Sequence, residues 1–259
     1  MFKDLEEMKK SDGSTRNLGK RLRSTNLLLG IITSVYGNLD IGKPYRLRSL
    51  NLFEFLSRFY HLTHVGLLLT TVTLCMGLVH KSNSCPGQSS PRGSFLLYNI
   101  YLYMLALTIA VETFIPVTFW VLWHIDKSLV VNTASYVGND SISFFFNLCM
   151  HGLPTIFLLV EFFCIEFFNT PGHYALIFGF FIGYLLTMYL CYVVNGYWPY
   201  GVVTMVSGVN RIGFFAVCFL SICFMYYSLI VLNRIIWRKK KEFSSRGATG
   251  ESDPSAKKR

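Results

Sequence analysis

Long apolar segments alternate with short polar ones along this chain. Five of the apolar segments reach the roughly 20 residues that a helix needs to cross the hydrocarbon core of a bilayer: Glu54–Val79, Phe95–Trp123, Ser141–Glu166, Tyr174–Asn195 and Arg211–Trp237. A water-soluble domain does not need five segments of this length and hydrophobicity. The pattern therefore predicts an all-α, polytopic membrane helical bundle.

A sixth apolar segment, Asn26–Tyr36, is shorter and leaves two interpretations open. Its eleven residues would form a helix of about 17 Å, against a hydrocarbon core of about 30 Å. The segment either crosses the membrane with help from its flanking residues or lies in the interface. The distribution of lysine and arginine distinguishes the two cases, because cytoplasmic segments carry an excess of both.

The charge count favours six transmembrane helices with both termini in the cytoplasm. If the short segment spans, the two sides carry seventeen and four Lys and Arg residues; if it does not, they carry eleven and ten. We therefore expect a basic cytoplasmic N-terminal tail over residues 1–24 and a six-span membrane domain over residues 25–237. We expect a basic cytoplasmic C-terminal tail over residues 238–259, and both tails have the polar composition of disordered segments.

Composition fits this membrane interpretation and limits the partners. Hydrophobic residues make up 52% of the chain and charged residues 15%, with a net charge of +10. Basic tails on a membrane protein set its orientation and contact anionic lipid headgroups. We therefore expect membrane lipids as partners and no nucleic acid.

Ionisable side chains inside the spans are candidates for chemistry, because each one is costly in lipid. Glu112, Glu161 and His151 lie deepest. A buried imidazole is kept neutral by desolvation, and a neutral imidazole is a competent general base. The alternative is that His151 only hydrogen-bonds to a neighbouring helix. Glu112 is a possible third group that orients His151, whereas Glu161 lies ten residues away from the histidine along the same span.

A base requires a nearby group to deprotonate, and Ser57 is the candidate nucleophile. It lies about one turn inside the second span, in the same leaflet as His151 in the six-span topology. The alternative is a serine that bonds to its own backbone and packs between helices. His61 and His64 share a helix face with Ser57 and are possible alternative partners. No set of His, Cys, Asp and Glu residues completes a metal site, so no metal ion or cofactor is expected.

Several motifs resemble the androgen-induced gene family of FAR-17a-like membrane proteins, over roughly residues 50 to 235. They are Phe55-Leu56-Ser57, Asn147-x-x-Met150-His151 with Glu161 ten residues later, Pro116–Asp126, Gly183-Tyr184 and Gly196-Tyr197-Trp198-Pro199-Tyr200. The resemblance implies a multi-span hydrolase of fatty acid esters of hydroxy fatty acids, with an intramembrane threonine nucleophile and a histidine partner. Carried over to this chain, it assigns His151 as the base and Ser57 as the nucleophile.

Serine at position 57 departs from the family threonine. A serine hydroxyl is able to perform the same reaction, so we prefer Ser57, which follows Phe55 and Leu56. A shifted alignment instead makes Thr63 the nucleophile.

The expected function is therefore intramembrane lipid ester hydrolysis of the serine/threonine type, with a lipid ester as substrate. The expected location is the endomembrane system, with the endoplasmic reticulum preferred over the plasma membrane. Two other functions remain open: a small-solute or proton-coupled transporter, and a non-enzymatic membrane scaffold.

Overall fold

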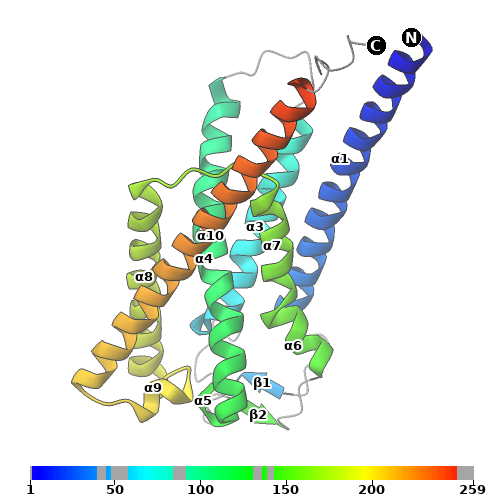
Figure 1. Cartoon of the computed structure of the whole chain (residues 1–259). Coiled ribbons are helices and arrows are strands. Elements are labelled where there is room, and N and C mark those ends of the chain that lie inside the picture. Colours follow the sequence, from blue (N-terminus) through cyan, green and yellow to red (C-terminus); the bar gives the residue numbers. More distant parts are fainter. Residues whose placement is uncertain are drawn as a thin grey trace.

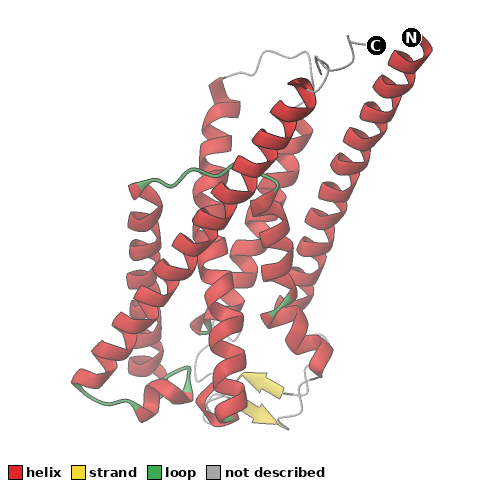
Figure 2. Ribbon diagram, viewed as in Figure 1, coloured by secondary structure: helices red, strands yellow, loops and turns green. Residues whose placement is uncertain are grey.

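The protein is a bundle of long helices with a short two-stranded antiparallel sheet at one end (Figures 1 and 2). The computed structural model describes residues 2–39, 45–47, 58–83, 92–130, 136–138 and 143–249. The long helices are α1 (Phe2–Asn38), α3 (Leu62–Asn83), α4 (Arg92–Ile125), α7 (Leu153–Phe163), α8 (Pro171–Asn195) and α10 (Val209–Thr249). The shorter elements are η1 (Arg58–Tyr60), α5 (Lys127–Val130), α6 (Phe144–His151), α9 (Gly201–Met205) and the antiparallel strands β1 (Tyr45–Leu47) and β2 (Tyr136–Gly138).

The predicted membrane helical bundle is confirmed. Among the described residues, five helical stretches are long and apolar enough to cross a membrane: α3, α4, α6 with α7, α8 and α10. Helix α1 is the sixth long element and packs against α3, α6 and α7. The start of α1 and the end of α10 lie at the same end of the bundle, opposite β1 and β2 (Figure 1).

Three helix boundaries differ from the expectation. The second span was expected from Glu54, but among the described residues its α-helix begins only at Leu62, after the 3-10 turn η1. Both expected tails also contain helix. In the N-terminal tail α1 starts at Phe2, and in the C-terminal tail α10 continues past Trp237 to Thr249. Ion pairs support the extension of α10, because Lys241 binds Glu166 at 2.6 Å and Arg238 lies 3.7 Å from Glu242.

The fourth span was expected to be continuous, but it is broken at Gly152 into α6 and α7. Pro154 explains the break. Proline has no N–H to donate, and its ring clashes with the carbonyl group four residues earlier. Gly152 takes a non-helical conformation with φ −145° and ψ −60°, so α6 ends at His151.

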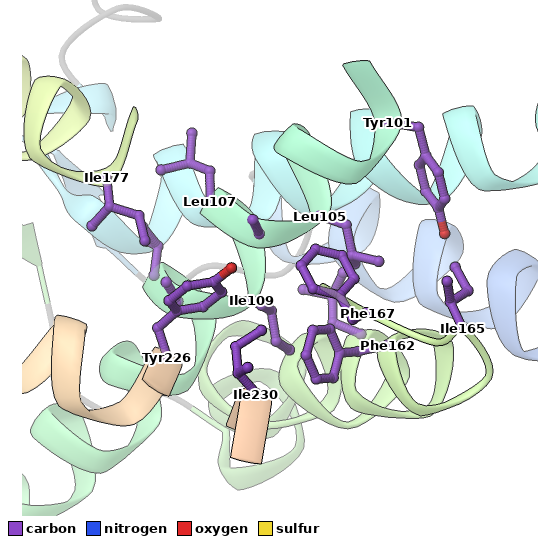
Figure 3. Packing of buried hydrophobic residues seen from close by; sticks show 14 of the residues in the cluster. Tyr101, Leu105, Leu107, Ile109, Phe162, Ile165, Phe167, Ile177, Tyr226 and Ile230 are labelled. Carbon is purple, nitrogen blue, oxygen red and sulfur yellow. The ribbon is translucent and has the colours of Figure 1, made fainter. Parts of the chain in front are cut away.

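The main hydrophobic core lies where α4 meets α3, α7, α8 and α10 (Figure 3). Tyr101, Phe162 and Tyr226 are among its largest fully buried side chains. Many apolar side chains on the outside of α8 and α10 are exposed, including Leu186 and Phe224. Such exposure is expected of helices that face lipid.

A buried ion pair joins α1 to the core. The Arg23 side chain donates to both carboxylate oxygens of Glu161, at 2.9 and 2.5 Å. Tyr101 donates to the same carboxylate. Glu161 is fully buried and the Arg23 side chain is 23% exposed, so the pair fastens α1 to α7 from inside the bundle.

Replacement of Arg23 by methionine should therefore destabilise the bundle by roughly 3 kcal/mol, because it leaves the Glu161 carboxylate buried without its cation. The midpoint of thermal unfolding in detergent measures this loss. Arg21→Met is the matched control, since Arg21 is exposed on the same helix and its loss should change the midpoint little. Equal midpoints for the two variants would show that the ion pair does not hold α1.

Candidate functional site

Thr63 and His151 meet inside the bundle. Oγ1 of Thr63 lies 3.4 Å from Nδ1 of His151, and both side chains are buried. Thr63 belongs to the first turn of α3, and His151 is the last residue of α6. The pair thus joins a hydroxyl and an imidazole, the two groups that nucleophilic acyl transfer requires.

The imidazole of His151 is held by an aromatic ring as well as by Thr63. The ring of Phe119, from α4, stacks on it with centroids 3.6 Å apart and planes 10° apart. This stacking fixes the plane of the imidazole. The break at Gly152 also affects the orientation of His151, because the chain leaves the helical path directly after this residue.

Ser57, the preferred nucleophile, lies outside the described residues. Among the residues that the structure describes, the hydroxyl next to His151 is that of Thr63, the residue favoured by the shifted alignment. The late start of α3 also gives Thr63 the place that Ser57 was expected to have, in the first turn of the span.

The start of α3 is held by hydrogen bonds from two other parts of the chain. The N–H of Leu62 donates to the Tyr200 hydroxyl at 2.7 Å, and the Tyr184 hydroxyl donates to the Tyr60 carbonyl at 2.9 Å. From the end of α1, Asn38 places its side-chain oxygen 3.0 Å from Nδ1 of His64. The backbone on both sides of Thr63 is therefore anchored.

The deep carboxylates are not partners of His151. Glu112 accepts a hydrogen bond from Thr70 at 3.2 Å, and its carboxyl group lies against Gly66, where an added Cβ would be 2.6 Å from Oε1. Its second oxygen has no hydrogen-bond partner among the described residues. Glu161 binds Arg23 and Tyr101 instead. Glu112 is therefore not placed to orient His151, and the contact of the imidazole with α4 is instead the stacked ring of Phe119.

Thr63 lines an apolar pocket. The space between atoms there is about 880 Å³, part of it open to the surroundings. The walls come from α4, α8, α10 and the segment around α9, and include Val111, Leu122, Phe181, Met188 and Cys218. The α4 wall alone runs from Leu122 to Val111, eleven helical steps or about 16 Å of helix. The shape and lining suit a long hydrocarbon chain.

Three residues of the site received no role from the sequence. Phe119, Tyr184 and Tyr200 lie in motifs that carried the family resemblance, but the motifs do not reveal which partners they have. Among the described residues, no group of three or more His, Cys, Asp or Glu side chains is arranged to hold a metal ion.

Comparison with known proteins gives two matches. The model of a family described as FAR-17a/AIG1-like protein matches residues 28–234. A protein of Schizosaccharomyces pombe described as a UPF0641 membrane protein is 24% identical over 164 residues, which cover 62% of this chain and 68% of the relative. No solved structure matches the chain.

Proposed function

Because this chain belongs to the FAR-17a/AIG1-like family, we propose that it is an intramembrane hydrolase of lipid esters, with Thr63 as nucleophile and His151 as general base. One observation carries the proposal: the two side chains are 3.4 Å apart, and Thr63 lines a pocket whose walls are mostly apolar. Substrates of the proposed class are fatty acid esters of hydroxy fatty acids, as the resemblance implies.

The proposed reaction is a double displacement. Nδ1 of His151 accepts the Thr63 proton while Oγ1 attacks the ester carbonyl carbon, which gives a tetrahedral intermediate. The ester bond to the alcohol then breaks, and the alcohol oxygen takes the proton from His151. Water, deprotonated by His151, attacks the acyl-threonine ester, and the fatty acid leaves while the proton returns to Thr63.

The geometry favours Nδ1 as the basic nitrogen. It is the ring nitrogen that faces Thr63, so the reactive tautomer carries its proton on Nε2. The 3.4 Å separation is longer than an ordinary hydrogen bond, and catalytic hydrogen bonds often shorten only when substrate is bound.

The proposal includes a topology and a location. The basic ends of α1 and α10 lie together (Figure 1), which supports an even number of crossings with both termini in the cytoplasm. Thr63 and His151 would then belong to the opposite leaflet, next to the non-cytoplasmic loops that admit water. We place the protein in the endomembrane system, with the endoplasmic reticulum as the preferred membrane.

A fluorophosphonate with a long alkyl chain should label Thr63 in the wild-type protein. Thr63→Ala and His151→Ala should each abolish labelling and lower ester hydrolysis by at least 1,000-fold, since nucleophile and base act as a unit. Ser57→Ala is the matched control and should retain both activities. Mass spectrometry of the labelled peptide identifies the residue.

Two outcomes would contradict this prediction. Labelling that persists in Thr63→Ala and disappears in Ser57→Ala would show that Ser57 is the nucleophile. Equal ester hydrolysis by the wild type and all three variants would refute the proposed hydrolase activity.

The pocket makes a separate prediction about chain length. Cys218 lines it from α10, and Cys223 on the same helix does not. Cys218→Trp should fill the pocket and reduce kcat/KM for long-chain esters at least ten-fold, while short-chain esters are hydrolysed as before. Cys223→Trp should leave the ratio of the two rates unchanged. If the ratio of kcat/KM for long-chain and short-chain esters is unchanged in both variants, the acyl chain does not occupy this pocket.

A further inference from the structure

A chain of hydroxyl groups ends beside the proposed nucleophile. The Tyr200 hydroxyl accepts from the N–H of Leu62, the residue that precedes Thr63, at 2.7 Å. The Tyr184 hydroxyl lies 2.9 Å from the Tyr60 carbonyl and 3.2 Å from the Tyr200 hydroxyl. Tyr184, Tyr200 and Thr63 all line the same pocket.

Counting protons shows that the Tyr200 proton is available. A phenol has one proton, so Tyr184 cannot donate to the Tyr60 carbonyl and to Tyr200 at once. If Tyr184 donates to the carbonyl, the Tyr200 proton bonds to Tyr184 over 3.2 Å, a long distance for two oxygens. If Tyr184 donates to Tyr200 instead, the Tyr200 proton has no acceptor among the described residues. In both arrangements it is bound weakly or not at all.

The chain around Tyr200 holds its hydroxyl in place. Gly196 ends α8 in the left-handed conformation, with φ 76°, and turns the chain back toward the bundle. Trp198 then stacks on Tyr192 with centroids 4.8 Å apart, and the Arg211 guanidinium lies 4.7 Å over the Trp198 ring. These contacts pack the segment Gly196–Tyr200 against α8 and α10, and from there the Tyr200 hydroxyl reaches the start of α3.

Ester hydrolysis through a tetrahedral intermediate requires a donor for the negative oxygen. Such donors are most effective when preorganised in a site that excludes water. Burial raises the pKa of the Tyr200 phenol above its ordinary value, so this hydroxyl keeps its proton at neutral pH.

We propose that Tyr200 is the oxyanion donor: when Thr63 attacks the ester, the Tyr200 hydroxyl turns from Tyr184 toward the carbonyl oxygen of the substrate. This inference rests on the proposed hydrolase. It gives Tyr200 contact with the reacting atoms and gives Tyr184 only a positioning role, because Tyr184 fixes the Tyr60 carbonyl and offers a resting partner for the Tyr200 proton.

The pair Tyr200→Phe and Tyr184→Phe tests the assignment in the full chain, in detergent or vesicles, with a long-chain fatty acid ester. Tyr200→Phe should lower kcat by roughly 100-fold or more, the loss typical of one oxyanion donor, with KM within about three-fold of wild type. Tyr184→Phe should keep kcat within about ten-fold of wild type, because it removes a competitor for the Tyr200 proton and leaves the donor in place.

Inhibitor binding separates this role from a structural one. A trifluoromethyl ketone with the same acyl chain forms a tetrahedral adduct that carries an oxyanion, whereas the product fatty acid does not. Tyr200→Phe should lower the affinity for the ketone by about the same factor as kcat, and it should leave the affinity for the fatty acid unchanged. If Tyr200→Phe does not fold, 3,5-difluorotyrosine at position 200 keeps the shape and lowers the phenol pKa. Activity should then disappear as the pH rises through that lowered pKa, while the wild type stays active.

Several results would overturn the assignment. They are wild-type kcat in Tyr200→Phe, an equal loss in Tyr184→Phe, parallel weakening of ketone and fatty acid, and an unchanged pH profile with difluorotyrosine. Each of these results is compatible with the proposed hydrolase activity if the wild type hydrolyses the ester and Thr63→Ala does not. Absence of hydrolysis and of fluorophosphonate labelling in the wild type would remove the hydrolase, and the oxyanion role with it.

Discussion

Polar groups inside this bundle have to find their partners within the protein, because lipid offers none. Asn233 on α10 illustrates how far this constraint organises the fold. Its side chain donates to the carbonyls of Phe162 and Ile165 at 2.9 Å and accepts from the N–H of Phe167 at 3.0 Å. One side chain thus satisfies the backbone where α7 ends and binds α10 to it. The ion pair of Arg23 and Glu161 connects α1 to α7 by the same logic.

The same constraint bears on why the two residues of the proposed site lie where helices begin and end. A continuous helix satisfies its own backbone and leaves little freedom in the direction of a side chain. At the break after His151, α6 and α7 are separate segments, and the histidine at the junction packs against Phe119 from α4. Thr63 lies at the start of α3, where the first N–H groups have no acceptor within the helix. There the Tyr200 hydroxyl takes over the role of acceptor for the N–H of Leu62.

The sequence predicted the membrane bundle and its principal spans because hydrophobic length is a strong signal that depends little on tertiary context. It also singled out His151 as a candidate, since an ionisable side chain in the middle of an apolar segment is rare, and the structure places this side chain inside the bundle. It placed the start of the second span too early, because the aromatic residues between Arg58 and Leu62 are apolar enough to continue a span on hydropathy alone. The 3-10 turn over these residues depends on tertiary contacts, such as the bond from Tyr184 to the Tyr60 carbonyl. Hydropathy does not record such contacts.

That shift of eight residues places Thr63 in the first turn of α3, and this position favours Thr63 as the proposed nucleophile. It also decides what surrounds the reaction. At the first turn of α3, Thr63 lines the same apolar pocket as Tyr184 and Tyr200, and this pocket extends as far as Val111. The proposed lipid ester suits this arrangement, because a hydrocarbon chain matches the apolar lining and an ester carbonyl matches the hydroxyl groups of Thr63 and Tyr200. A nucleophile two turns deeper, at the level of Thr70, would face Glu112 rather than His151. The chemistry proposed for this protein therefore depends on the ordered turn that precedes α3 as much as on the two residues that react.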